Sequence, residues 1–223
     1  MKQASGSAAV VRRAKRTHAK RGTIIPLPTT ARGQRTRQKL LDSAESVFGE
    51  RGFHNAGIIE ITQRADVALG TFYLYFPDKK SIFDDLVHTL NTRLRKTISD
   101  RVRDVDDRLE QEVLGFETFF EFVRRHRNLY RVILQAETVD EDLYRWHYRT
   151  LADGYVRGIR KAQTAGQVRS DLDAETMAYA LMGMAEALGS RYVLWDGTLP
   201  PRSTKRTIRA FLEGGMRRPK LKR

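Results

Sequence analysis

Apolar residues recur at helical spacing along almost the whole chain from Arg35 onward. In residues 40–48 the apolar side chains fall three or four positions apart, so they share one face of a helix. They are Leu40, Leu41, Ala44, Val47 and Phe48. No strand-like alternation persists and no internal repeat is visible. The pattern therefore predicts an all-α fold for this 223-residue chain.

Helix-breaking and capping residues divide the pattern into segments. Gly52 ends the first helix, and Asp78 is a good N-cap for the fourth. Further breaks fall at Asn128, at 138–140, at 165–166, and between Asp196 and the Pro200–Pro201 pair. The expected helices are 35–51, 58–65, 69–75, 79–103, 109–126, 127–137, 140–165, 173–195 and 203–215.

Positive charge is concentrated at the two ends of the chain. The net charge is +14, but residues 1–39 carry eleven Lys and Arg and the last eight residues carry five, all without an acid. Basic ends attract a polyanion, and nucleic acid is the commonest one. A solubilising tail or an organelle transit peptide are the alternatives. Because prolines and glycines interrupt residues 1–33, we expect a flexible basic arm there, and a basic tail at 216–223.

Several classes of protein are excluded by what the sequence lacks. The chain has no Cys, which rules out a disulfide scaffold, a thiolate metal site and a cysteine nucleophile. No run of 18 apolar residues predicts a membrane span. The five His are scattered, and no motif of a nucleotide-binding, serine-hydrolase or zinc enzyme occurs. We expect no enzyme, no metal, no cofactor and a cytoplasmic protein.

Two short helices joined by a tight turn at Asp66–Val67 form a candidate helix-turn-helix. In the second of them Phe72 and Phe76 share a face and point into the core. Gly70, Thr71 and Leu74 lie on the opposite side, with Tyr73 and Tyr75 on the flanks. The two phenols either donate hydrogen bonds to phosphates or are simply amphipathic rim residues.

The stretches RTRQKLLDSAESVFGERGF at 35–53, IIEITQRADVALGTFYLYF at 58–76 and PDKKSIFDDLV at 77–87 resemble the DNA-binding domain of the tetracycline-repressor (TetR) family. The resemblance covers about a quarter of the chain. It implies a helix-turn-helix DNA-binding domain at 34–80. It also implies a larger helical domain for ligand binding and dimerisation at 81–215.

The resemblance also implies which residues meet DNA. The helix from Leu69 to Tyr75 is then the recognition helix in the major groove. Lys79 matches the family's phosphate-clamping lysine, and residues near the start of the first helix lie along the DNA. The expected DNA-contacting residues are Arg35, Leu69, Gly70, Thr71, Tyr73, Tyr75 and Lys79.

This chain departs from the family pattern at three places. Asp66 stands where the turn usually has Gly, although Asp tolerates the left-handed conformation better than most residues. Ala56–Gly57 replaces the hydroxyl residue that usually caps the second helix, so Asn55 is the alternative cap. Leu69 replaces a polar base reader, and it either contacts a thymine methyl or is buried.

The larger domain is expected to contain a pocket, because aromatic residues are frequent in its first half. The basic run 124–127 either meets an acidic ligand, such as a coenzyme-A thioester, or is a solvated helix end. The expected ligand-binding residues are Phe119, Val123, Tyr130, Trp146 and Tyr155. The small residues of 177–189 and the last helix resemble the family's dimer interface, with Ala180, Gly183, Ala187 and Phe211 as the expected contacts.

Together these observations predict a homodimeric transcriptional regulator that responds to a ligand. We expect a repressor that is released from a palindromic double-stranded DNA operator by a small apolar or acidic effector. The helix from Lys79 to about Arg103 joins both domains and is the expected lever. The alternative is a non-specific DNA-binding protein driven by its basic tails. Either protein would work in the bacterial cytoplasm, associated with the nucleoid.

Overall fold

The computed structural model describes residues 25–217. Within this range every regular element is a helix, apart from an isolated bridge between Val168 and Arg217. The expectation of an all-α fold is confirmed. Residues 1–24 of the expected arm and residues 218–223 of the expected tail lie outside the described residues.

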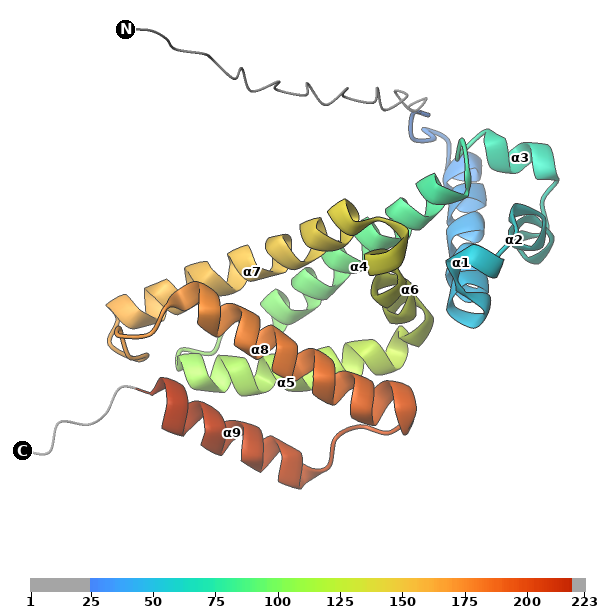
Figure 1. Ribbon diagram of the computed structural model, residues 1–223. Helices are drawn as coiled ribbons and strands as arrows, with labels where there is room; N and C mark the ends of the chain where they lie inside the picture. Colours follow the sequence, from blue (N-terminus) through green and yellow to red (C-terminus); the bar gives the residue numbers. More distant parts are fainter. Residues whose placement is uncertain (1–24, 218–223) are drawn as a thin grey trace, which may run out of the picture.

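The first three helices form a small unit at one end of the molecule (Figure 1). They are α1 (Ala31–Asn55), α2 (Ile58–Ala65) and α3 (Leu69–Tyr73). Buried Phe48 of α1, Ile61 of α2 and Phe72 of α3 belong to the hydrophobic core. Phe72 and Phe76 are both almost completely buried, as the helical spacing predicts.

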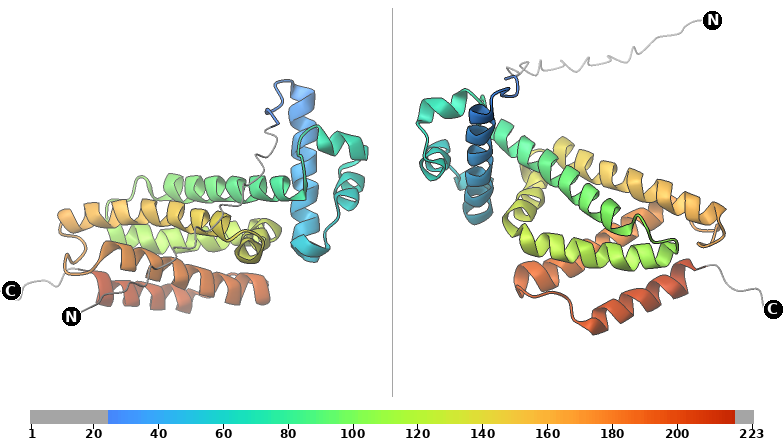
Figure 2. Two further views of the ribbon diagram at one scale, coloured as in Figure 1. Left: turned by 45° about the horizontal axis from the view of Figure 1, so that its top comes forward. Right: turned by 180° about the vertical axis from the view of Figure 1, so that it is seen from behind.

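The α4 helix (Lys79–Val102) leaves this unit and enters a larger helical body (Figures 1 and 2). Asp78 caps it through a reciprocal pair of bonds with Ser81, which confirms the expected start. The other helices are α5 (Arg108–Arg125), α6 (Arg127–Val139), α7 (Glu141–Thr164), α8 (Ala174–Leu188), η1 (Gly189–Trp195) and α9 (Arg202–Met216). Because α6 packs against both α1 and α4, it connects the small unit to the larger body.

Several boundaries differ from the expectations. The first helix continues past Gly52 to Asn55, and α3 ends at Tyr73 rather than Tyr75. The first helix begins at Ala31 because the Thr30 hydroxyl accepts a hydrogen bond from the Gly33 amide, so three residues of the expected arm are helical. The N-cap of α2 is Gly57 and has no side-chain cap bond, so the assignment of Asn55 as the cap was wrong. The side-chain amide of Asn55 donates instead to the Arg51 carbonyl.

The expected helix 173–195 is two elements. The α-helix ends at Leu188, and the chain continues as the π-helix η1. A Cβ atom on Gly189, the first residue of η1, would lie only 2.9 Å from Cε1 of Phe119. The wider turn therefore starts where the backbone passes very close to an aromatic ring of α5, a tertiary contact that periodicity does not reveal.

Two residues with left-handed backbone shape the small unit. Gly52 has φ 77° and interrupts α1, as its position in the sequence predicts. Asp66 has φ 55° and ψ 52° and forms the turn between α2 and α3. The turn therefore survives without glycine.

We predict that Asp66→Val destabilises the protein by about 1 kcal/mol, because a β-branched residue is strained in this conformation. Asp66→Asn should stay close to wild type, since Asn also tolerates it. Urea denaturation followed by far-ultraviolet circular dichroism measures both variants. Equal midpoints for the Val variant and wild type would contradict this account of the turn.

Candidate functional site

The surface formed by α2 and α3 exposes apolar and aromatic side chains. Ile59 is 60% exposed, Leu74 69%, Tyr73 49% and Leu69 44%. Leu69 is therefore not buried, which leaves the thymine-methyl alternative. A Cβ atom on Gly70 would meet nothing within 4 Å, so another surface can approach the backbone closely there.

Thr71 and Tyr75 are only partly exposed. The Tyr75 hydroxyl lies 3.6 Å from the position of a Cβ on Gly33, so it packs against the start of α1. The segment 25–28 lines a small hollow beside Tyr75 and Phe76. The start of α1 and the residues that follow α3 therefore lie together at one end of the molecule.

Three cationic side chains of the small unit are already paired with carboxylates. Arg64 binds Glu50 through two nitrogens, at 2.7 and 2.9 Å. Arg51 binds Glu60, and Arg37 binds Asp85.

Among the described residues up to the start of α4, three exposed cations have no carboxylate partner, namely Arg32, Arg35 and Lys39. Their spacing of three and four residues places them on one face of α1. We call this set the α1 cationic stripe.

The side chain of Lys79 has a structural role. Its ammonium donates to the carbonyl oxygens of Phe53 at 2.7 Å and Ala56 at 2.8 Å, and lies 4.5 Å from the centre of the Phe53 ring. It thus binds carbonyls at the end of α1. Burial lowers the pKa of Lys79 from its ordinary value. The expected phosphate contact of this ammonium would require breaking those bonds, which spacing alone could not reveal.

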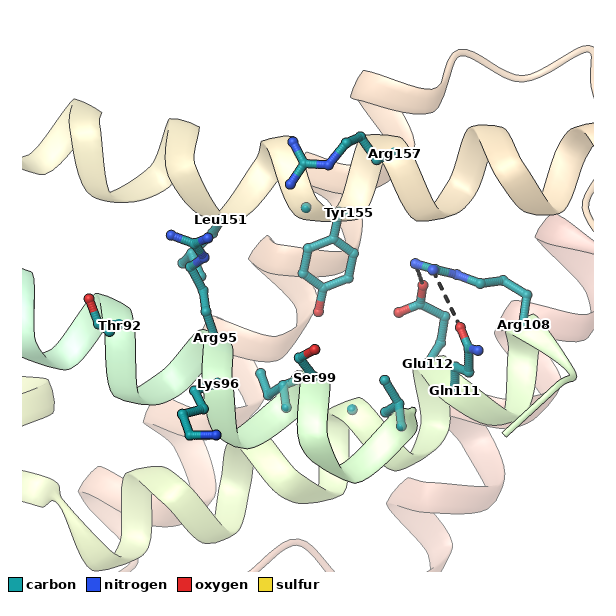
Figure 3. A pocket seen from close by; sticks show the side chains of 14 residues that line it. Thr92, Arg95, Lys96, Ser99, Arg108, Gln111, Glu112, Leu151, Tyr155 and Arg157 are labelled. Atoms are coloured by element: carbon teal, nitrogen blue, oxygen red, sulfur yellow. Dashed lines mark hydrogen bonds and ion pairs between the residues drawn. The ribbon is translucent and has the colours of Figure 1, made fainter. Parts of the chain in front are cut away.

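A cavity of about 560 Å³ lies between α4, α5 and α7 in the larger body (Figure 3). Arg95, Arg108 and Arg157 lie around the ring of Tyr155 in this view. Lys96 adds a fourth basic residue to the lining. We call this space the outer cavity. Sequence reasoning missed all four cations, because they come from three helices and share no local motif, and it favoured the run 124–127 instead.

A buried acid faces these cations. Glu112 is 3% exposed and pairs with Arg108. Burial raises the pKa of Glu112, and the neighbouring Arg108 opposes that shift. The Nε atom of Arg108 is buried without a hydrogen-bond partner. Lys96 pairs with Asp100 at 2.7 Å and Arg108 with Glu112, whereas Arg95 and Arg157 have no carboxylate partner among the described residues, so two unpaired cations remain around the outer cavity.

A second, smaller cavity of about 50 Å³ adjoins the outer cavity, and we call it the inner chamber. Both spaces are lined by Ile98, Gly115, Leu151 and Tyr155. Phe119, Tyr130 and Tyr155, three of the expected ligand-binding residues, line the inner chamber.

The other two expected ligand-binding residues lie elsewhere. Val123 is completely buried in the core, and Trp146 stacks on His88 with ring centres 4.1 Å apart. Neither side chain lines the outer cavity or the inner chamber. The aromatic and apolar content of a helix does not distinguish core packing from a cavity wall.

A buried polar pair also borders the inner chamber. Asn91 is completely buried, and its amide nitrogen donates to the His147 carbonyl at 3.1 Å and lies 3.2 Å from His147 Nδ1. Nδ1 therefore accepts, and the neutral ring carries its proton on Nε2. Burial lowers the pKa of His147 to about 4, so the ring is neutral near pH 7.

The contact between α1 and α6 is built around the interruption at Gly52. Gln135 accepts a hydrogen bond from the Phe53 amide at 2.7 Å and donates one to the Phe48 carbonyl at 3.1 Å. These backbone groups lie on either side of the left-handed residue Gly52. The two helices also pack closely here, since a Cβ on Gly49 would lie 2.6 Å from the Cβ of Asn128. We call this contact the α1–α6 joint.

A second tie links the start of α4 to the start of α7. Lys80 pairs with Asp84 on its own helix and with Asp140, the N-cap of α7. Asp140 also accepts from the Leu143 amide at 2.9 Å. The hydrogen bond with Lys80 is the largest of the effects that lower the pKa of Asp140. Both ends of α6 are therefore fixed to elements of the small unit or to α4.

The α8 and α9 helices lie on the side of the larger body away from α1–α3 (Figure 2). The expected dimer residues Ala180, Gly183, Ala187 and Phe211 are all exposed. A Cβ on Gly183 would meet nothing within 4 Å, and Phe211 is 69% exposed. Trp195, at the end of η1, is 73% exposed.

Residues 25–217 contain no cluster of three His, Asp or Glu side chains that could hold a metal ion. In the same range no helix is long and apolar enough to cross a membrane.

Comparison with known proteins identifies the small unit. Residues 40–86 match the model of the bacterial regulatory proteins of the tetR family. YdgC of Bacillus subtilis, an HTH-type transcriptional regulator, is 29% identical over 83% of this chain and 95% of its own length. The transcriptional activator FasR of Mycolicibacterium smegmatis is 33% identical over 56% of this chain and 59% of its own length.

A solved crystal structure also has the same fold over most of this chain. FadR of Bacillus subtilis, a transcriptional regulator crystallised with stearoyl-CoA, superposes with a TM-score of 0.71 and 18% identity over 80% of this chain and 98% of its own. At this identity the similarity establishes the fold. Regulators of this kind are not enzymes. The helix-turn-helix of this chain therefore belongs to the tetR family of bacterial regulatory proteins, and most of the chain is similar to an HTH-type transcriptional regulator.

Proposed function

We propose that this protein is a homodimeric repressor that an effector with an anionic group and an apolar portion releases from a palindromic operator. The observation that carries the effector's chemistry is the outer cavity, where Arg95, Lys96, Arg108 and Arg157 surround an opening that adjoins the largely apolar inner chamber. Cations in a partly desolvated cavity favour an anion, and apolar walls favour hydrocarbon.

On the DNA side, α3 enters the major groove. Leu69, Gly70 and Thr71 approach base edges, and Tyr73 donates to a phosphate. Tyr75 supports α3 from beside the start of α1. The α1 cationic stripe contacts the phosphate backbone, since its three side chains are exposed and carry no internal counter-ion. Lys79 contributes indirectly by holding the end of α1.

Dimerisation uses the exposed faces of α8 and α9. Ala180, Gly183 and Ala187 form one exposed stripe at helical spacing, where a partner helix approaches closely. Phe211 adds an exposed aromatic ring from α9. An isologous contact of this kind provides two recognition helices about 34–36 Å apart, which match successive turns of DNA.

The α6 helix carries the signal between the two sites. Tyr130 and Ile133 line the inner chamber, whereas Asn128 and Gln135 contact α1. An effector that displaces the chamber face of α6 therefore shifts the face that holds the small unit. The α4 helix moves with it as the lever, since Lys80 ties it to α7.

The relatives are consistent with this proposal and also define its alternative. FadR was crystallised with stearoyl-CoA, a large anion with a long apolar chain. FasR is an activator, so the direction of regulation has to be measured by in vitro transcription from an operator-containing promoter. The protein would act at the nucleoid in the bacterial cytoplasm.

The first prediction concerns DNA. Selection from random duplexes should enrich a palindrome whose half-site centres lie roughly ten base pairs apart. Arg35→Ala with Lys39→Ala should lower the slope of log K against log salt by about 3.6, since two phosphate contacts are lost in each of the two subunits. Fluorescence anisotropy at several salt concentrations measures the slope.

The matched control is Arg101→Ala with Lys161→Ala, which removes two exposed charges from the larger body outside α8 and α9. This variant should leave the slope nearly unchanged. If no sequence is enriched and both double variants lose affinity equally, binding is non-specific and driven by overall charge.

The second prediction concerns the effector. Fatty acids and coenzyme-A thioesters of graded length should include compounds that raise the melting temperature and weaken operator binding. Arg95→Ala with Arg157→Ala should weaken binding of such a compound about tenfold, because two exposed cations at the outer cavity are lost. Thermal shift and calorimetry measure this effect, with Arg145→Ala on the outer surface of α7 as the control. If the double variant and the Arg145→Ala control bind the compound with equal affinity, the outer cavity is not the effector site.

The third prediction concerns the α1–α6 joint. Gln135→Leu keeps a similar volume but removes both hydrogen bonds, so the Phe53 amide should exchange with deuterium about tenfold faster. The effector should then release the operator less completely, because α6 no longer holds α1. Hydrogen-exchange mass spectrometry and operator titrations measure the two effects, with Glu137→Leu on the exposed face of α6 as the control. Faster exchange with full release by the effector would make the joint a purely structural contact.

A further inference from the structure

Polar side chains gather in the part of the inner-chamber lining that is not shared with the outer cavity. His147 and Tyr148 come from α7, and Glu186 comes from α8. The Tyr148 hydroxyl donates to Glu186 Oε2 at 2.6 Å. The remaining lining is mostly apolar and includes Phe119 and Met182. A carboxylate among such neighbours needs hydrogen-bond donors to offset its loss of water.

The polar groups differ in what they offer a ligand. Glu186 keeps acceptor capacity, since a carboxylate has about four lone-pair sites and Tyr148 occupies one of them. His147 accepts from Asn91 through Nδ1, so its Nε2–H is the donor of a ring that lines the chamber. Burial raises the pKa of both Tyr130 and Tyr148, and both phenols therefore remain protonated.

The size of the chamber limits what can enter it. Its volume of about 50 Å³ compares with the 10–15 Å³ that one water requires, so it holds only a few heavy atoms. The outer cavity is about ten times larger and contains the basic residues. A ligand that reaches through the shared wall at Tyr155 therefore places its bulk and its anion outside and only its tip inside.

We propose that the inner chamber selects an effector whose tip, opposite the anionic group, ends in a neutral hydroxyl that donates to Glu186 and accepts from His147. A second carboxylate at the tip is rejected by Glu186, and a plain methyl leaves the polar wall unpaired. This inference rests on the proposed function, because it takes the anionic end of the effector to lie in the outer cavity.

Three eight-carbon acids test the tip directly: octanoic acid, 8-hydroxyoctanoic acid and octanedioic acid, each also as the mono-coenzyme-A thioester. Calorimetry with the wild-type chain should give the hydroxy compound at least tenfold higher affinity than the methyl compound. The dicarboxylic compound should bind most weakly. The comparison requires no mutation, so it does not depend on a variant that folds.

Glu186→Gln should then reduce the preference for the hydroxy over the dicarboxylic compound at least tenfold, since the neutral amide no longer repels a carboxylate. Glu121→Gln, on the outer surface of α5 with its side chain 52% exposed, is the control and should keep the wild-type order.

The two proposals fail in different ways. If the methyl compound binds as well as the hydroxy compound, the selective tip is overturned while the anionic effector remains. If none of the acids or thioesters binds, the proposed effector class is overturned together with the tip. An unchanged order in Glu186→Gln would remove Glu186 from the recognition of the tip.

Discussion

The arrangement of the molecule depends on how the interruption of α1 at Gly52 is satisfied. A left-handed residue disturbs the regular hydrogen bonding of a helix, and backbone groups left unpaired are costly when buried. Gln135 of α6 bonds an amide on one side of Gly52 and a carbonyl on the other with one side chain. Lys79 then binds the carbonyls at the end of the same helix. The small unit is thus held by polar bonds with fixed directions, and its orientation is specified more closely than apolar packing alone would achieve.

This construction gives α6 two faces with different tasks. One face lines the inner chamber through Tyr130 and Ile133, and the other holds α1 through Asn128 and Gln135. In the mechanism that we propose, the route from the outer cavity to DNA runs through this one helix, whereas α4 supplies a longer parallel connection.

The sequence predicted the features that depend on local chemistry. The all-α class, the Asp78 cap, the interruption at Gly52 and the turn at Asp66 all follow from residues within one or two helical turns. Features that depend on distant partners were missed. The Lys79 ammonium is taken by carbonyls more than twenty residues away, and the π-helix begins where Gly189 meets Phe119. The cations of the outer cavity come from three helices, so no window of sequence contains them together.

The close approach of Gly49 to Asn128 has a consequence for engineering and for evolution. Only glycine fits on the α1 side, and on the α6 side the partner has to leave that space open. A chimaera that joins this DNA-reading unit to a foreign sensing body through α4 alone would break the fit, even with a continuous backbone. The surface that an exchange of domains has to preserve therefore lies between α1 and α6. We expect recombination to keep the fold only where both surfaces are exchanged as a matched pair.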